Sequence, residues 1–258
     1  MSLSPTLTHD LHLNPPSNDR DANTSNREVT IVCISDTHGD HRALTSYVPP
    51  GDILIHAGDY TLYGKRDDAA DFNIWLGELK DAKKFQHIIV VQGNHECTAG
   101  WKRESKGILT NARLLTNEEV NIEVEISEPL HLPLTNNEKG KKCDIRIFGT
   151  DFSWPALEPH CPKLDKIKEH VDIIVSHCPA MGYLDVNDGC PALLKTVHRV
   201  KPCLLISGHM HRDRGITALE DATGNVTTTF VNAATVDKRK VTKGPIVLRV
   251  HIDAIMSS

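Results

Sequence analysis

Potential metal ligands follow several apolar runs of this 258-residue chain, each at the point where the run ends. In "IIVVQGNHE", residues 88–96, four apolar residues lead through Gln-Gly into Asn94, His95 and Glu96. Gly-Asn is also common turn chemistry, so these three side chains alone could form an ordinary solvated corner. The pattern recurs with Asp36 and His38 in "ISDTHGD", Asp59 in "HAGDY", His177 in "VSHCP", and His209 and His211 in "SGHMH". This repetition favours one shared functional site over separate turns.

The number of these donors indicates a centre with two metal ions. Two carboxylates, four imidazoles and one amide are too many for one catalytic metal that keeps an open position. Two divalent ions carry +4, while Asp36, Asp59 and one hydroxide return −3, which leaves a net charge of about +1. An anionic phosphoester suits that charge, and two ions about 3.5–4 Å apart can share one oxygen nucleophile. Water, rather than a side chain, would then be the nucleophile.

Eight short apolar runs, rich in β-branched residues, supply the elements that position these donors. They are "VTIVCISD", "DILIHAGD", "HIIVVQGN", "DIRIFGTD", "VDIIVSHC", "CLLISGHM", "TTTFVNAA" and "PIVLRVHI". Continuous runs of this kind are typical of strands buried on both faces. In a layered α/β protein the carboxyl ends of neighbouring strands open onto one crevice. We therefore expect donors that are far apart in sequence to meet there.

Helices are predicted between some of these strands. An apolar stripe at i, i+3, i+4 and i+7 predicts a helix over residues 66–82, and a second is predicted over 191–200, with a weaker one over 162–170. Alternating strands and helices imply βαβ units. Residues 1–27 are rich in Ser, Thr, Asn, Asp and Pro, which predicts a flexible tail or a loosely docked arm. The polar segment 135–142 is predicted to be a turn or insertion between strands.

Some residues near the motifs receive other interpretations. His56, inside "ILIHAG", is interpreted as a core histidine. Glu96 is interpreted as structural support, because a third acid on the metals would remove their positive excess. His41, Tyr60 and Arg212, and also Cys97, are weak candidates for substrate binding because they adjoin motif residues.

The ordered motifs "SDTH", "GD", "GNHE", "SH" and "GHMH" resemble those of the calcineurin-like metallophosphoesterase superfamily, whose pattern is DxH, GD, GNH[DE], a single His and GHxH. The resemblance spans about Ile34 to His211. The stretches "GDILIHAGDYTLYG", "FNIWLGEL", "VDIIVSHCPAMGYLD" and "VNAA" most closely resemble the branch called metallophosphoesterase domain-containing proteins. The resemblance implies an α/β fold, an α/β/β/α sandwich of two packed mixed sheets flanked by helices, over residues 28–255.

The same resemblance implies a role for each motif residue. Asp36, His38 and His211 would bind one metal, Asn94, His177 and His209 would bind the other, and Asp59 would bridge the two. His95 would not be a ligand but would lie beside the leaving-group oxygen, as an acid or to stabilise developing charge. The implied activity is a phosphodiesterase for small phosphodiesters such as cyclic nucleotides, through attack of a metal-bridging hydroxide. We expect two divalent ions, with Mn²⁺ preferred and Fe, Ni, Co or Zn as alternatives.

The composition narrows the range of partners. The chain has 29 basic and 34 acidic residues, a net charge of −5 and no long basic block, which argues against a nucleic-acid groove and a polybasic membrane anchor. No apolar stretch approaches the roughly 18 residues that span a bilayer, and the N-terminus lacks a signal-peptide pattern. Seven cysteines without a CxxC pair favour free thiols in a reducing compartment. We therefore expect a cytoplasmic protein with a small phosphoester substrate and no membrane partner.

Two other functions remain open from the residues. "GDY" and "GNHE" also occur in protein serine/threonine phosphatases, but "GDYTLYG" lacks the arginine of their "GDYVDRG" continuation. A non-catalytic scaffold on the same fold is the other alternative, although such a protein would be expected to lose its ligands first. A cysteine phosphatase is disfavoured, because the position six residues after Cys178, where its arginine belongs, is Leu184.

Overall fold

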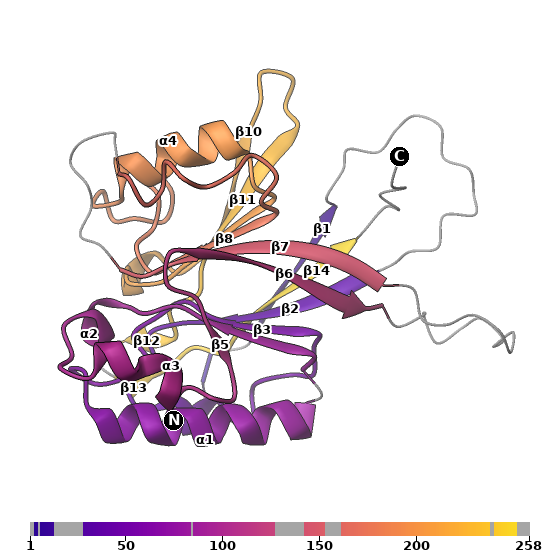
Figure 1. The fold of residues 1–258 in the computed structure, drawn as a ribbon. Helices are drawn as coiled ribbons and strands as arrows, with labels where there is room; N and C mark the ends of the chain where they lie inside the picture. Colours follow the sequence, from indigo (N-terminus) through magenta and orange to yellow (C-terminus); the bar gives the residue numbers. More distant parts are fainter. Residues whose placement is uncertain are drawn as a thin grey trace, which may run out of the picture.

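Two six-stranded sheets pack face to face, and helices cover their outer faces (Figure 1). This computed structural model describes residues 3, 4, 6–12, 28–83, 85–126, 142–152, 161–237 and 240–251. In Figure 1, α1 (Arg66–Lys83) lies below the first sheet and α4 (Pro191–Val200) lies above the second. The arrangement is the predicted α/β/β/α sandwich of two mixed sheets.

The first sheet carries three of the ligand-bearing motifs. Its strand order is β1-β14-β2-β3-β4-β5. The strands from β2 to β5 run parallel to one another, whereas β14 runs antiparallel to β2 and parallel to β1. The strands are β1 (Leu7–His12), β2 (Glu28–Ile34), β3 (Ile53–His56), β4 (His87–Val90), β5 (Arg113–Leu114) and β14 (Ile246–His251).

The second sheet carries the remaining motifs. Its order is β10-β11-β9-β8-β7-β6, with the four central strands parallel and both edge strands antiparallel to their neighbours. The strands are β6 (Glu118–Glu125), β7 (Lys142–Thr150), β8 (Ile173–Ser176), β9 (Leu204–Ser207), β10 (Gly215–Glu220) and β11 (Val226–Asn232).

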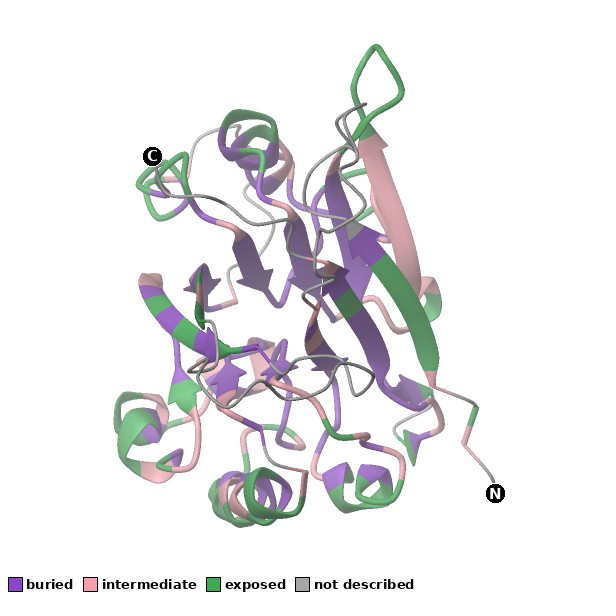
Figure 2. Cartoon of the chain, turned by 90° about the vertical axis from the view of Figure 1, so that its right-hand side faces the viewer, coloured by how far each residue is buried: buried purple, intermediate pink, exposed green. Residues whose placement is uncertain are grey.

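Three apolar layers hold the sandwich together, and Figure 2 shows their buried residues in purple along the strands. Because side chains alternate along a strand, Ile31 and Cys33 of β2 face the second sheet, while Val32 and Ile34 join the cluster that includes α1. On the other side, α4 packs its own apolar face against the second sheet. Each sheet is therefore covered on both faces, as the continuous apolar runs predicted.

The elements agree with most of the sequence predictions. All eight apolar runs contain strands, and the helices predicted at 66–82 and 191–200 are α1 and α4. The helix predicted at 162–170 is wrong, because those residues form successive turns. A strand that was not predicted, β1, forms within residues 1–27 and pairs with β14. Residues 13–27 lie outside the described residues, as does the polar segment 135–142 apart from Lys142, the first residue of β7.

Short elements fill the connections near the strand ends. They are η1 (His41–Leu44), α2 (Asn94–Cys97), η2 (Lys102–Glu104), α3 (Ser105–Ile108), η3 (His211–Asp213) and the small ribbon of β12 (Val236–Asp237) with β13 (Lys240–Val241). Across the described ranges, no helix is both long and apolar enough to cross a lipid bilayer.

Candidate metal centre

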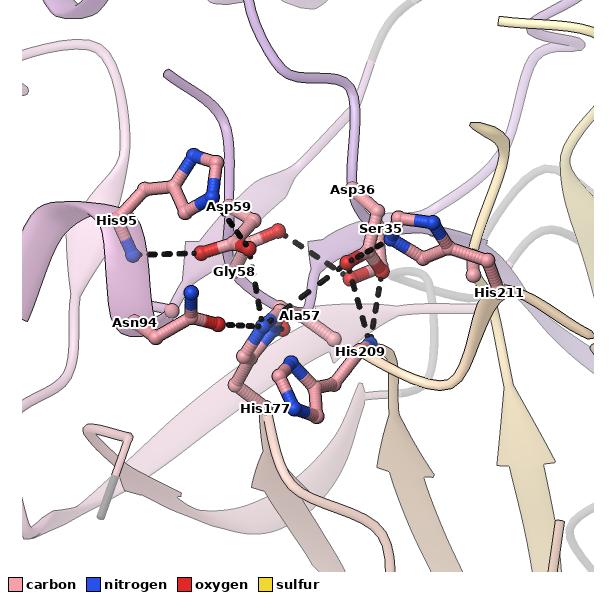
Figure 3. A network of polar contacts seen from close by, with 12 residues as sticks. Ser35, Asp36, Ala57, Gly58, Asp59, Asn94, His95, His177, His209 and His211 are labelled. Atoms are coloured by element: carbon pink, nitrogen blue, oxygen red, sulfur yellow. Dashed lines mark hydrogen bonds and ion pairs between the residues drawn. The ribbon is translucent and has the colours of Figure 1, made fainter. Parts of the chain in front are cut away.

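The seven predicted ligands and His95 come together at the carboxyl ends of strands from both sheets, and Figure 3 shows most of them. Parallel strands end at the same edge of a sheet, so their loops converge there. Asp36 and His38 follow β2, Asp59 follows β3, Asn94 begins α2 after β4, His177 follows β8, and His209 and His211 follow β9. The convergence expected from the sequence is therefore present.

One cluster joins Asp36, His38 and His211, whose donor atoms lie within 4.8 Å of one another. Nε2 of His211 lies 3.1 Å from Oδ1 of Asp36 and 3.4 Å from Nε2 of His38. Asp36 is fully buried, and its Oδ2 accepts a hydrogen bond of 2.9 Å from the backbone amide of His209. The loop after β9 is thereby tied to the end of β2.

A second cluster joins Asp59, His177 and His209. Nε2 of His177 lies 3.4 Å from Oδ2 of Asp59 and 3.2 Å from Oδ1 of Asn94. Nδ1 of the same ring lies 2.7 Å from the carbonyl oxygen of Ala57, which only accepts hydrogen bonds. Nδ1 therefore donates a hydrogen to this carbonyl, and Nε2 is the ring nitrogen that faces the cluster and would bind a metal on losing its own proton.

Asp59 lies between the two clusters. Besides its contact with His177, it forms a third group of potential metal ligands with His38 and His95. Its side chain is only 2% exposed. Donors from both predicted ligand sets thus surround the one carboxylate that the resemblance assigns as a bridge.

Burial and neighbouring charges shift the pKa values of the site residues, in some cases in opposite directions. Burial disfavours the charged form of His177, but the Asp59 and Asp36 carboxylates outweigh burial and raise the pKa of His177 to about 9. Burial likewise opposes ionisation of Asp36, yet His177 and His211 hold its pKa below the ordinary value. Burial and the neighbouring His177 lower the pKa of His209 to about 4. The carboxylates are thus kept ionised, as ligands for a cation must be.

The backbone at the site is strained. Asp36, His38, Asp59 and His209 have φ values of +56°, +46°, +55° and +67°, in the left-handed region that non-glycine residues seldom adopt. Asp and His tolerate this region better than most residues, but each such residue still costs about 1 kcal/mol or more. A Cβ on Gly208 would collide with Ser35 and Asp36. These loops are therefore shaped to bring the donors together.

Glu96 supports the loops rather than entering either cluster. Its buried carboxylate accepts hydrogen bonds from the backbone amides of Asp59, Thr61 and Gly93, and from the hydroxyl of Thr61. Burial and the nearby Asp59 carboxylate raise its pKa to about 7. These contacts fit the structural interpretation of Glu96 made from the sequence.

His95 lies beside the clusters with its ring held by backbone groups. Its Nδ1 is 2.9 Å from the amide nitrogen of Tyr63 and 3.0 Å from the carbonyl oxygen of Thr61. Its Nε2 lies 3.8 Å from Oδ2 of Asp59. His95 therefore presents one ring nitrogen to the site, while the other has a backbone partner in either tautomer.

A cavity of about 210 Å³ opens over the clusters. It is lined by His38, Asp59, Leu62, Tyr63, Asn94, His95, His209 and His211. His41 and Tyr60, weak substrate-binding candidates from the sequence, do not line it: both are fully buried behind the site against Phe72. Arg212 is exposed and also lies outside this lining.

Three residues near the centre were not predicted from the sequence. Leu62 and Tyr63 line the cavity, and Phe152 lies with its ring centroid 5.2 Å from that of His209. Leu62 and Phe152 have no donor atom that would draw attention in a search for ligands. The departure of "GDYTLYG" from the phosphatase pattern was the available signal, because it marks the positions of Leu62 and Tyr63.

The donor set fits two metal ions. Imidazole, carboxylate and amide groups without a thiolate suit divalent ions such as Mn, Fe, Co, Ni and Zn. Within the described residues, two clusters of three donors meet at buried Asp59. Each cluster opens to the same cavity through at least one lining residue. The His/Asp clusters therefore fit a dinuclear metal centre.

Known proteins resemble this chain in sequence or in fold. A UPF0046 protein of Caenorhabditis elegans is 34% identical over 242 residues, covering 85% of this chain and 74% of that protein. Metallophosphoesterase domain-containing protein 1 of Homo sapiens is 32% identical over 224 residues, covering 79% of this chain but only 65% of the human protein. A crystal structure from Thermus thermophilus matches with a TM-score of 0.50 over 79% of this chain and 88% of that one, and at 13% identity it supports the fold alone.

The family model for calcineurin-like phosphoesterases matches residues 29–213, which include every motif of the metal centre. That span is well over half of the chain, and the relatives above 30% identity extend across most of it. This chain therefore belongs to the calcineurin-like phosphoesterase family.

Proposed function

We propose that this protein is a phosphodiesterase that hydrolyses small phosphodiesters, cyclic nucleotides among them, at a dinuclear metal centre. Membership of the family and the His/Asp clusters support the broader activity, a metal-dependent phosphoesterase. The observation that carries the proposal is the pair of donor clusters that meet at Asp59 beneath one cavity. The cavity of about 210 Å³ is small for a ligand pocket, which favours a small substrate.

In this proposal the chain's own residues divide the work. Asp36, His38 and His211 would hold one ion and Asn94, His177 and His209 the other, with Asp59 as the ligand proposed to serve both. Bound divalent ions would supply positive charge for the phosphoryl oxygens and activate water. His95 stands beside the departing oxygen and gives it a proton from Nε2, while the Thr61 carbonyl and the Tyr63 amide keep the ring oriented. Mn²⁺ is the proposed metal, with Fe, Ni, Co or Zn as alternatives.

The alternative functions have less support. A protein serine/threonine phosphatase has a charged "DR" pair where this chain has Leu62 and Tyr63, and both of these apolar residues line the cavity. A scaffold without catalysis does not need seven assembled donors with strained backbone at four of them. The geometry therefore favours a small-molecule hydrolase.

The test is an assay of the purified protein, stripped by a chelator and then reloaded with Mn²⁺. The substrates are bis-p-nitrophenyl phosphate, p-nitrophenyl phosphate, and 2′,3′- and 3′,5′-cyclic nucleotides. We expect turnover that depends on metal and is faster on the diesters than on the monoester. Absence of metal-dependent turnover on all of them would overturn the enzyme assignment, and a preference for the monoester would overturn the diesterase assignment.

A further inference from the structure

The cavity over the metal centre has one apolar wall. Six of its eight lining residues carry imidazole, carboxylate or amide groups, and the other two are Leu62 and Tyr63. Tyr63 is 62% exposed. This ring gains little from folding, and its place in the cavity lining matches ligand sites, which combine apolar or aromatic side chains with a few placed polar groups.

The backbone around Tyr63 is firmly held. The Leu62 amide donates to Asp68, the Tyr63 amide lies 2.9 Å from Nδ1 of His95, and the Trp101 indole donates to the Gly64 carbonyl. Tyr63 itself has a φ of +56°, which a bulky residue adopts only when its surroundings impose it. The backbone that carries the exposed ring is thus already held in place before any substrate binds.

The ring of Tyr63 is stacked on His95. The two centroids are 5.3 Å apart and the planes are inclined by 20°. Under the proposed function, His95 meets the oxygen that leaves the phosphorus. The organic group that carries the leaving oxygen would therefore lie next to Tyr63 and Leu62.

We propose that Tyr63, with Leu62 beside it, binds a planar aromatic group of the alcohol that leaves the phosphorus, and so selects esters whose alcohol is a nucleoside. This specificity rests on the proposed phosphodiesterase activity. A ring presented at fixed orientation loses little entropy on stacking, and every nucleobase has a face that can stack on it. Leu62 and Tyr63 would thus bind the organic group of the substrate, while the donor clusters would bind its phosphoryl group.

A matched pair of substrates tests the proposal. Adenosine 2′,3′-cyclic phosphate and base-free ribose 2′,3′-cyclic phosphate share the same leaving oxygen and differ only in the base. For the unaltered protein we expect kcat/KM to favour the adenosine ester by about tenfold or more, the usual effect of one base–aromatic stack. The ratio should persist in Tyr63→Phe and fall toward one in Tyr63→Ala. Ile74→Ala removes another exposed apolar side chain, on α1 and outside the cavity lining, and should leave the ratio unchanged.

Binding provides a second readout that does not need turnover. Isothermal titration calorimetry should show adenosine monophosphate binding more tightly than ribose 5-phosphate to the Mn²⁺-loaded protein, with that advantage lost in Tyr63→Ala and kept in Tyr63→Phe. If Tyr63→Ala changes neither the kinetic ratio nor the binding advantage, the role of Tyr63 is overturned while the phosphodiesterase assignment stands. If no ester is hydrolysed, the proposed function fails and calorimetry alone decides whether Tyr63 binds a base.

Discussion

His95 is held differently from the seven predicted metal ligands. Backbone groups of Thr61 and Tyr63 contact its Nδ1, while the predicted ligands contact one another. The general-acid role proposed for His95 requires a ring that changes its protonation state without moving, and a backbone partner for either tautomer meets that requirement.

His95→Asn should therefore lower kcat by about 10²–10⁴-fold, the usual contribution of a general acid. Both metal equivalents should remain, because the predicted ligands are untouched. The measurement pairs turnover with metal content by mass spectrometry of the desalted protein. Loss of one metal equivalent in this variant would mean that His95 is a ligand instead.

Asp59→Asn should weaken both metals together. Asp59 forms one donor group with His177 and His209 and another that includes His38. Replacing it with an amide removes a negative charge that both groups share. Metal affinity is measured by competition with a chelator, with Asp67→Asn, an exposed carboxylate in the first turn of α1, as the matched control. If only one of the two metals became weaker, Asp59 would not be a bridge.

His56 gives the metal-free protein a pH dependence. It is fully buried, its Nδ1 accepts from the Gly58 amide, and burial lowers its pKa to about 3. A histidine with a folded pKa below its unfolded value of about 6.5 stabilises the fold above pH 6.5 and loses this contribution as the pH falls toward 3. From pH 7 to pH 5 the expected loss is about 2 kcal/mol.

The measurement is urea unfolding at pH 7 and pH 5, in the presence of chelator, for the unaltered protein and His56→Gln. The variant should be less stable at pH 7 but should lose less on acidification, by roughly the 2 kcal/mol just given. Equal losses in the two proteins would show that His56 does not titrate in this range. The core interpretation of His56 made from the sequence agrees with its burial and its hydrogen bonds to Thr37 and Gly58.

The sequence predicted which donors would meet because residue type and strand-end position suffice for that. It did not predict that His41 and Tyr60 lie behind the site. Both adjoin motif residues in sequence, but adjacency does not determine which way a side chain points. The left-handed backbone of Asp36 and Asp59 was equally inaccessible, since contacts between distant loops impose it.

At the scale of elements, the end of β11 connects the loops that carry the donors. The Asn232 side chain donates to the carbonyls of Met210 and Leu184, and its Oδ1 accepts from the Ala234 amide. Thr235, just beyond, donates through its backbone and hydroxyl to the Ser35 carbonyl, next to Asp36. Asn232 and Thr235 thus join the loop after β9 to the loop after β2.

Asn232→Ala should therefore lower metal affinity by about 10–100-fold, the usual effect of removing a group that orients a ligand loop. Asn225→Ala changes an exposed asparagine in the turn between β10 and β11, and should leave affinity unchanged. Metal titrations on both variants, with circular dichroism to confirm folding, make the comparison. Unaltered affinity in Asn232→Ala would show that the loop holds its shape without this amide.

Central strands and long helices were predictable, whereas edge strands were not. The parallel strands carry continuous apolar runs, and α1 carries a stripe of period 3.6. By contrast, β1 and β10 lie at sheet edges and exist as strands because of the partners they pair with. The prediction of a helix at 162–170 failed because buried apolar residues do not by themselves specify a helix. Leu164 and Ile167 are buried, but they lie in a segment of turns.

At the scale of the whole molecule, the predicted ligands come from both sheets. Asp36, Asp59 and Asn94 come from the first sheet, whereas His177 and His209 come from the second. Ions held by both sets would link the layers at one edge, in addition to the contacts that already join His177 to Asp59 and His211 to Asp36. The sandwich itself followed from the family resemblance, because apolar runs alone do not determine how two sheets stack.

Metal loading should therefore raise the melting temperature. An ion at 100 times its dissociation constant adds about 2.7 kcal/mol to the folded state if it does not bind the unfolded chain. For a protein of this size we expect a rise of about 5–10 °C, since roughly 1 kcal/mol shifts the midpoint by about 2–4 °C. Scanning calorimetry with and without Mn²⁺ measures it, and Asp59→Asn should reduce the rise. An equal rise in Asp59→Asn would place the stabilising ion elsewhere.

The pairing of β1 affects how this protein can be handled. Before that strand begins, the Ser4 amide donates to the Thr242 carbonyl and the Gly244 amide donates to the Ser4 carbonyl. Between those two partners, Lys243 donates through its Nζ to the carbonyl of His211. Ser4 is thus a few contacts from the edge that carries the candidate metal ligands. Trimming the chain back to Glu28 would remove both Ser4 and β1, and with them contacts to the segment whose Lys243 supports the loop of His211.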